Sequence, residues 1–164
     1  MRRGFMVVLT VLVAVPASPQ ERPAPAAEFA TGVLLFADDG VVTEAFAGGS
    51  ARFYVSPRIG IGPELAFVSG DNHSHFIVTG NVTFDIIGPS STAAIRPFLI
   101  AGGGIFQTTE DFPNGTFTSS DGAFTAGGGV RVLAGSRAYV GVEARVGWEL
   151  HLRVNAIVGV RLGG

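Results

Sequence analysis

The sequence predicts an all-β fold: an eight-stranded antiparallel up-and-down transmembrane β-barrel, preceded by a signal peptide. Three observations lead to this prediction. Between residues 45 and 162, apolar residues alternate with small or polar ones in runs of about nine to eleven residues, as in strands that cross a bilayer. Glycine- and polar-rich breaks separate the runs, and nearly every arginine occupies a polar position of the alternation. Charged residues make up only 15% of the 164 residues, well under the usual quarter.

The composition excludes several other classes of protein. After the N-terminal leader, no uninterrupted apolar stretch approaches the length of a membrane-spanning helix. The net charge of -2 provides no basic surface for nucleic acid, so we expect no nucleic-acid partner. The absence of cysteine excludes disulfides, thiol catalysis and zinc–thiolate sites. The chain has the length of one domain, and we expect no cofactor.

The first element is a secretory signal peptide. The basic pair Arg2 and Arg3 precedes an apolar stretch at residues 5–15, which is too short to span a membrane as a mature helix, and small residues follow it. An uncleaved N-terminal anchor is the alternative. We predict a signal peptide at residues 1–17, a flexible Pro- and Ala-rich spacer at 18–27 and an outer-membrane β-barrel at 28–162.

Eight strands follow from the alternation. In chain order they are predicted at 28–37, 44–55, 58–68, 75–87, 94–107, 122–133, 137–148 and 151–162. The longest and most acidic connections follow the odd-numbered strands, which matches bacterial barrels with long outer loops and short periplasmic turns. The longest connection, 107–121, is expected to be a mobile polar loop and a candidate contact site for an extracellular ligand.

From the second strand onward, each strand turns small or polar residues to one face. The predicted inward residues are, in order, Gly48, Ser50 and Arg52; Gly60, Gly62 and Glu64; Thr79, Asn81, Thr83 and Asp85; Arg96, Phe98, Gly102 and Gly104; Gly127, Gly129 and Arg131; Gly141, Glu143 and Arg145; Arg153, Asn155, Gly159 and Arg161. The predicted outward residues include Ile59, Ile61, Leu65, Phe67, Val78, Val82, Phe84, Leu99, Val130, Val142, Val146, Val154, Val158 and Val160. Phe36, Phe46, Phe76 and Trp148 fall near strand ends and are expected at the membrane–water boundary.

Energetics decide which face is inward. An arginine turned to lipid at the midplane costs roughly 2–4 kcal/mol, and five of the predicted strands each carry at least one. We expect Asp85 to pair with Arg96 across a turn near residue 90. With three carboxylates for six arginines, the lumen should be net positive, and an eight-stranded barrel is only wide enough for its own side chains. The predicted interior polar network is Arg52, Glu64, Asp85, Arg96, Arg131, Glu143, Arg145, Arg153 and Arg161.

Several segments resemble a known group of proteins. Residues 95–106 read Arg-Pro-aromatic, alternating glycines and an aromatic, and 57–65, 127–131 and 142–145 are similar to neighbouring strands of the same group. Over about residues 28–162 the chain resembles small OmpA/OmpX-like outer-membrane barrels. The resemblance implies a porin-like fold in a Gram-negative outer membrane, structural, adhesive or defensive roles, partners in outer-membrane lipid and the barrel assembly machinery, and no catalytic residues.

The C-terminus departs from that group. The chain ends Val160-Arg161-Leu162-Gly163-Gly164, whereas such barrels usually end in an aromatic residue that the assembly machinery reads. Either its assembly signal differs, or its last residues are atypical or incomplete.

Two groups of residues suggest chemistry. His73 and His75 could share a strand face as a metal pair needs, but no third ligand is evident, and we expect no metal. Glu149 and His151, with Ser119 or Ser120, would form a rim triad for deacylating lipid. These are common residue types whose geometry the sequence does not fix, so we predict no catalytic and no cofactor-binding residue.

The function that fits best is non-enzymatic, with a structural, membrane-integrity or surface-interaction role for a monomer. The first alternative is a narrow pore for small solutes or anions, because the predicted lumen carries excess arginine. Two further alternatives are a rim-located lipid-modifying enzyme and a soluble lipocalin-like binder. The binder would need an apolar lumen and a polar exterior, which is the reverse of the observed alternation.

Overall fold

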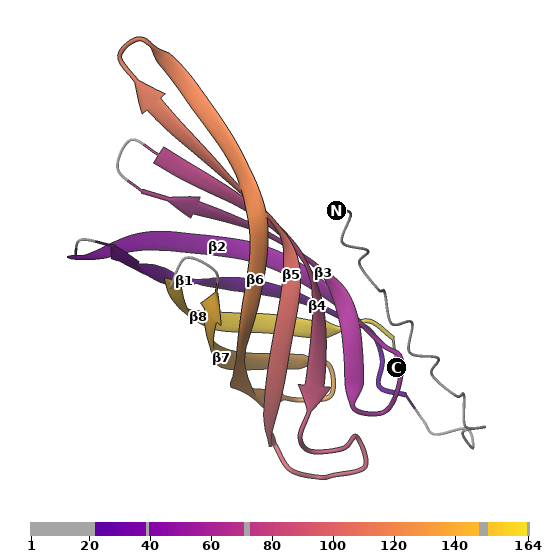
Figure 1. Ribbon diagram of the computed structural model, residues 1–164. Coiled ribbons are helices and arrows are strands. Elements are labelled where there is room, and N and C mark those ends of the chain that lie inside the picture. Colours follow the sequence, from indigo (N-terminus) through magenta and orange to yellow (C-terminus); the bar gives the residue numbers. More distant parts are fainter. Residues whose placement is uncertain (1–21, 39, 71–72, 148–150, 164) are drawn as a thin grey trace, which may run out of the picture.

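The structure is one closed barrel (Figure 1). This computed structural model describes residues 22–38, 40–70, 73–147 and 151–163. Eight antiparallel strands pair in sequence order, and the last closes on the first. The strands are β1 (Ala26–Asp38), β2 (Gly40–Tyr54), β3 (Ile59–Ser69), β4 (His73–Asp85), β5 (Ile95–Phe112), β6 (Gly115–Ala134), β7 (Ala138–Gly147) and β8 (His151–Arg161). The predicted eight-stranded up-and-down barrel is confirmed.

The N-terminal predictions fall partly outside these residues. The signal peptide at 1–17 lies outside the described residues. The last two residues of the predicted spacer belong to the barrel, because β1 begins at Ala26, which pairs with Arg52 on β2 and Arg161 on β8. Among the described residues, no helix is long and apolar enough to cross a membrane.

The predicted mobile loop at 107–121 is wrong. β5 and β6 have 18 and 20 residues, against 10 and 11 for β7 and β8. Their pairing runs unbroken through this segment to Phe112 opposite Gly115, and the hairpin projects far beyond the barrel wall (Figure 1). The segment is rich in Thr, Ser and Phe; Thr and Phe favour strands, and outside a membrane neither face of a hairpin has to be apolar.

The two faces of the barrel differ as predicted. Val142 is 62% exposed, whereas the next residue, Glu143, is 4% exposed. The aliphatic residues predicted to point outward are exposed, with Val130 half-buried. Phe46 and Phe36 were expected at the membrane boundary and instead lie inside, Phe46 in an apolar cluster and Phe36 packed against it. Trp148 lies outside the described residues.

Two apolar clusters lie inside the barrel, among the charged side chains. Near the hairpin end, buried apolar side chains form one cluster, of Leu34, Phe46, Ala66, Val68, Ile77 and Phe106. A second cluster consists of Ala26, Phe98, Ile100, Tyr139 and Ile157. Of these eleven residues, only Phe98 is among the residues predicted to point inward, because small and polar residues were expected on that face.

Inward glycines let neighbouring strands and long side chains approach closely. A Cβ atom on Gly127 would lie 2.0 Å from the carbonyl oxygen of Ala144, a distance that real Cβ atoms do not adopt. We expect Gly127→Ala to lower the free energy of unfolding by about 1–3 kcal/mol, because the backbone must shift. Chemical unfolding in lipid vesicles measures this change.

Gly80 provides the matched control for Gly127. It lies on the outer face of β4, and a Cβ atom there would meet nothing within 4 Å. We expect Gly80→Ala to change the free energy of unfolding by less than about 0.5 kcal/mol. Equal effects at Gly80 and Gly127 would show that crowding inside the barrel is not what requires glycine.

Candidate functional site

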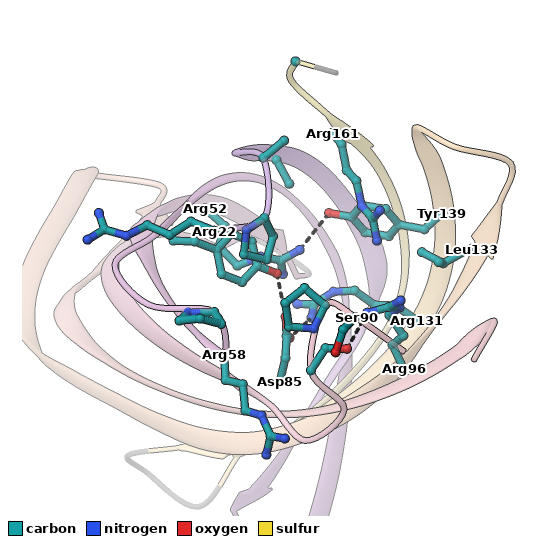
Figure 2. A pocket seen from close by; sticks show the side chains of 18 of the residues that line it. Arg22, Arg52, Arg58, Asp85, Ser90, Arg96, Arg131, Leu133, Tyr139 and Arg161 are labelled. Atoms are coloured by element: carbon teal, nitrogen blue, oxygen red, sulfur yellow. Dashed lines mark hydrogen bonds and ion pairs between the residues drawn. The ribbon is translucent and has the colours of Figure 1, made fainter. Parts of the chain in front are cut away.

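At the end of the barrel that holds the β2–β3, β4–β5 and β6–β7 connections and both described chain ends, the lumen opens into a basic vestibule. Figure 2 shows this cavity, which has a volume of about 590 Å³. Its charged lining consists of Arg22, Arg52, Arg58, Arg96, Arg131, Arg161 and Asp85. An anion entering here would meet a strongly positive wall.

The mouth cluster closes the vestibule from the lumen side. It consists of Glu28, Arg52, Asp85, Arg131 and Tyr139, contributed by five strands. Glu28 Oε1 accepts hydrogen bonds from Arg52 Nη1 at 2.9 Å, Arg131 Nε at 3.0 Å and the Tyr139 hydroxyl at 2.7 Å. Arg131 Nη1 donates to Asp85 Oδ1 at 3.2 Å, and the Arg131 guanidinium lies 3.5 Å from the centre of the Phe98 ring.

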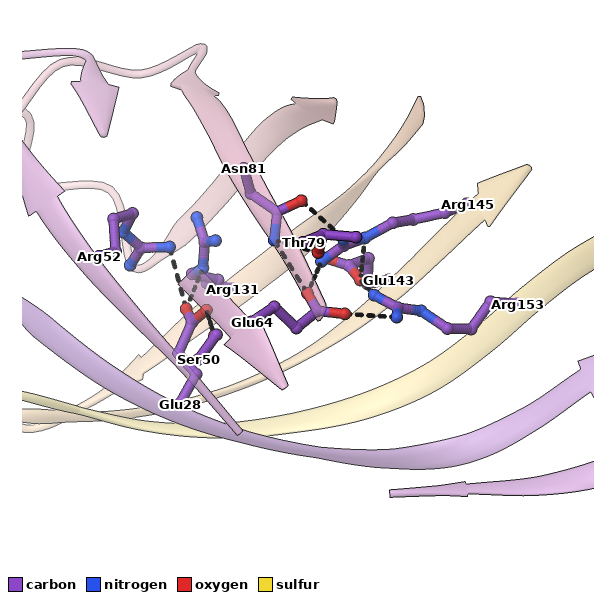
Figure 3. A network of polar contacts seen from close by, with 10 residues as sticks. All are labelled: Glu28, Ser50, Arg52, Glu64, Thr79, Asn81, Arg131, Glu143, Arg145 and Arg153. Carbon is purple, nitrogen blue, oxygen red and sulfur yellow. Dashed lines mark hydrogen bonds and ion pairs between the residues drawn. The ribbon is translucent and has the colours of Figure 1, made fainter. Parts of the chain in front are cut away.

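The central cluster lies deeper in the lumen and consists of Glu64, Asn81, Glu143, Arg145 and Arg153 (Figure 3). Arg145 Nη2 donates to Glu64 at 2.8 Å and its Nε donates to Glu143 at 2.6 Å. Arg153 bridges the same two carboxylates, with 2.5 Å to Glu64 and 3.1 Å to Glu143. Asn81 donates to Glu64 at 3.2 Å and accepts from Arg145 at 3.3 Å. These contacts tie β3, β4, β7 and β8 together across the lumen.

Little space remains between the two clusters. The cavity bordered by Glu28, Ser50, Glu64 and Glu143 has a volume of only about 10 Å³. That is about the least space that holds one water molecule. The side chains therefore fill the lumen at this level.

One predicted pair is wrong. Asp85 lies opposite Phe98 in the β4–β5 register, two residues from the expected partner Arg96. Asp85 bonds instead with Arg131 and with the Tyr54 hydroxyl at 2.6 Å. Arg96 donates to the carbonyl oxygens of Gly88 and Ser91, at 3.3 and 2.7 Å. The long connection between the strands shifts the register, and it supplies the acceptors for Arg96.

Within the two clusters positive and negative charges balance, and the expected excess of positive charge lies at the vestibule. Each contains two carboxylates and two guanidinium groups among the described residues. The charge balance depends on Glu28, which the count of inward carboxylates above does not include. It was placed in the first predicted strand without being assigned to a face. Buried charges require partners, so the unbalanced arginines Arg96 and Arg161 lie at the vestibule, where water reaches them.

A third polar group, the histidine cluster of Glu44, His73 and His75, lies at the hairpin end. His73 Nε2 contacts Glu44 Oε1, and His75 Nε2 lies 3.3 Å from Glu44 Oε2. The side of His75 away from Glu44 bonds through Nδ1 to Thr108 Oγ1 at 3.0 Å. The sequence analysis missed Glu44 as a third group because it lies on another strand, 29 residues before His73.

The described residues of the alternative rim triad lie on different strands. His151 on β8 is buried, with its ring 5.7 Å from the ring of Phe36 and 6.5 Å from that of Phe106. Ser119 and Ser120 lie on β6 and pair with residues of β5. Glu149 lies outside the described residues, so the structure does not test the triad, which remains an alternative.

This geometry defines a class of protein: a small closed barrel with an apolar exterior and a side-chain-filled lumen. Solved structures with the same fold are outer-membrane barrels. Neisserial surface protein A matches with a TM-score of 0.74 and 9% identity, covering 84% of this chain and 97% of that chain. The N-terminal barrel domain of Pseudomonas aeruginosa OprF matches with a TM-score of 0.65 and 12% identity, covering 86% and 100%.

A third similar structure is Ail, the attachment invasion locus protein of Yersinia pestis. Its TM-score is 0.60 and its identity 10%, over 86% of this chain and 99% of that chain. No protein-family model and no curated protein matches the sequence. The resemblance to OmpA/OmpX-like barrels is therefore confirmed at the level of the fold, that of the small eight-stranded outer-membrane barrels.

Proposed function

We propose that this protein is a non-enzymatic, non-conducting β-barrel of the outer membrane, with a structural or surface-interaction role. The observation that carries the proposal is the central cluster, in which Arg145 and Arg153 each bind both Glu64 and Glu143. A barrel closed by such contacts cannot act as an open channel. The charge pairs hold the wall together from inside, as a structural role requires.

The exterior supports the membrane placement. Residues such as Leu65, Val142 and Val158 form a continuous exposed apolar surface, which water would not favour on a soluble protein. A lipocalin-like binder would show the opposite arrangement. By analogy with bacterial barrels, the end that holds both chain ends faces the periplasm, and the β5–β6 hairpin faces outward. Export by the signal peptide at 1–17 and insertion of a monomer by the assembly machinery complete the proposal.

The hairpin supports a surface role. A strand of about 9–11 residues crosses the membrane. β5 and β6 exceed that length by about eight residues, which at about 3.3 Å per residue adds roughly 25 Å. Phe112 and Phe117 are exposed near its tip. Two of the similar structures are a surface protein and an attachment protein by their names, so we propose that the hairpin, rather than a loop at 107–121, contacts an extracellular ligand.

The alternative is a narrow anion pore that begins at the vestibule. The arginines that line the vestibule would favour anions, but the clusters and the roughly 10 Å³ space between them oppose passage. We expect the purified barrel to produce no conductance steps in planar bilayers, while a known porin in the same bilayer does. Regular steps of uniform size would contradict the non-conducting barrel and favour the pore.

Membrane placement requires a separate experiment. We expect the protein in the outer-membrane fraction of a Gram-negative host, with a band whose gel mobility changes on boiling, because a closed barrel resists detergent. The control is the same sample boiled before loading. Recovery in the soluble periplasm without a heat-dependent shift would contradict the outer-membrane barrel.

A further inference from the structure

We propose that Glu44, His73 and His75 bind one divalent transition-metal ion such as Zn²⁺ at the hairpin end of the barrel. One ligand atom from each residue can be chosen so that all three lie within 4.8 Å of one another. Zinc takes nitrogen and carboxylate oxygen ligands at about 2.0–2.2 Å, which places ligand atoms roughly 3–4 Å apart. Small side-chain rotations therefore bring these atoms to bonding distance.

The hydrogen bonding of His75 suits a metal ligand. Its Nδ1 bonds to Thr108 Oγ1 at 3.0 Å, and its Nε2 points toward Glu44. Metal-bound histidines commonly donate their second ring N–H to an oxygen, which fixes the ring orientation and tautomer. Phe36 and Phe106 pack beside the same ring, with centroid distances of 5.6 and 4.8 Å. The His75 ring is thus held by its surroundings, independently of a metal.

Glu44 differs from the carboxylates of the other two clusters. Glu28, Glu64 and Glu143 each form ion pairs with two arginines. Glu44 is just as deeply buried, yet its ion-pair contacts in the described part of the chain are with the two imidazoles. A guanidinium group cannot bind a metal ion, whereas neutral imidazole can. This cluster therefore has ligand chemistry that the others lack.

The surroundings leave the proposed metal site accessible from one side. The side chain of His73 is 27% exposed, so water or a small ligand can occupy a fourth coordination position. The apolar cluster around Leu34 and Phe106 closes the site toward the lumen. At Gly70, an added Cβ atom would lie 2.4 Å from His73 Nε2 and 2.7 Å from Glu44 Oε1. Glycine at position 70 thus keeps this space free.

The donor set selects among metal ions. Two imidazole nitrogens and one carboxylate oxygen suit Zn²⁺ and its transition-metal neighbours, whereas Ca²⁺ and Mg²⁺ prefer sites built entirely of oxygen. We expect Zn²⁺ to bind and Ca²⁺ not to bind. Cu²⁺ would bind at least as tightly as Zn²⁺, in the usual order for such sites.

The test is calorimetric titration of the folded, tag-free chain in detergent with zinc chloride. We expect one ion per chain. Because loss of a supporting group alone costs about 10- to 100-fold in affinity, His75→Gln should weaken binding about 100-fold or more, and Thr108→Val about 10-fold or more. His151→Gln is the control with the same change in histidine count, and it should leave the affinity unchanged. Heat-dependent gel mobility confirms that each variant is folded.

Cobalt substitution provides a second measurement. Co²⁺ bound to nitrogen and oxygen ligands absorbs visible light, and we expect this absorption to be absent from Glu44→Gln. No zinc binding to the folded wild-type chain would overturn the proposal. Zinc binding that His151→Gln abolishes and His75→Gln retains would also overturn it. The result is independent of the conductance and fractionation experiments, because it is measured on the purified barrel.

Discussion

Replacing Glu64 by alanine is expected to lower the free energy of unfolding by about 3–5 kcal/mol, because it leaves buried charges without a partner. Glu64 accepts from both Arg145 and Arg153, and their side chains are no more than 6% exposed. After the substitution, Glu143 would be the one carboxylate of the central cluster left to pair with both guanidinium groups. The measurement is chemical unfolding in lipid vesicles, followed by tryptophan fluorescence or by heat-dependent gel mobility.

Two variants separate this effect from the loss of any carboxylate. Glu110 is an exposed carboxylate on the projecting hairpin, and Glu110→Ala should change the free energy of unfolding by less than about 0.5 kcal/mol. Combining Glu64→Ala with Arg153→Ala removes one buried charge of each sign, so the double variant should be more stable than the sum of the single effects implies. Strict additivity would show that Glu64 and Arg153 do not stabilise each other.

The same cluster shows what the sequence could predict. Alternation alone places Glu143 and Arg145 on one face and Val142 on the other, because successive side chains of a strand point to opposite sides. The cost of an arginine in lipid then decides which face is inward. Both steps use only local spacing and one transfer energy. The strand count and the facing of the second to eighth strands were therefore within reach of the sequence.

The sequence could not predict which side chains of different strands pair with each other. The partner of Asp85 depends on how many residues the β4–β5 connection uses, and an error of two residues exchanged Arg96 for Phe98. Glu28 and Glu44 were missed for a related reason. Each joins its cluster through contacts with strands distant in sequence, such as Glu28 with Arg131, 103 residues away. Alternation indicates the face of a residue but not its height in the barrel.

The sequence also could not predict how far each strand continues beyond the membrane-spanning region. Inside lipid the alternation is strict, because each outward residue must be apolar. Beyond the lipid that requirement ends, and Thr108 and Thr118 can belong to a strand whose two faces are both polar. The alternation therefore stopped near the membrane boundary, while the β5–β6 pairing continued to its turn. The sequence indicated the lipid-covered part of each strand rather than its full length.

Placing an arginine on the outer face tests the membrane environment directly. Val142 lies in the middle of β7 and is 62% exposed, between Val130 on β6 and Ala156 on β8. In lipid, we expect Val142→Arg to lower the free energy of unfolding by about 2–4 kcal/mol, because the charge would lie near the midplane. On the exposed surface of a soluble protein, the same change would cost less than about 0.5 kcal/mol. Chemical unfolding in phospholipid vesicles distinguishes the two cases.

A residue at a different depth in the membrane provides the control for this prediction. Ile95 is also exposed, but it is the first residue of β5, at the vestibule end of the barrel. Near the interface a lipid-facing arginine costs only about 0–1 kcal/mol, so Ile95→Arg should be nearly neutral. A surface in water would make both substitutions cheap, and a close-packed protein interface would make both costly. Only a lipid-covered barrel makes the central substitution costly and the terminal one tolerable, so equal effects at Val142 and Ile95 would contradict the membrane placement.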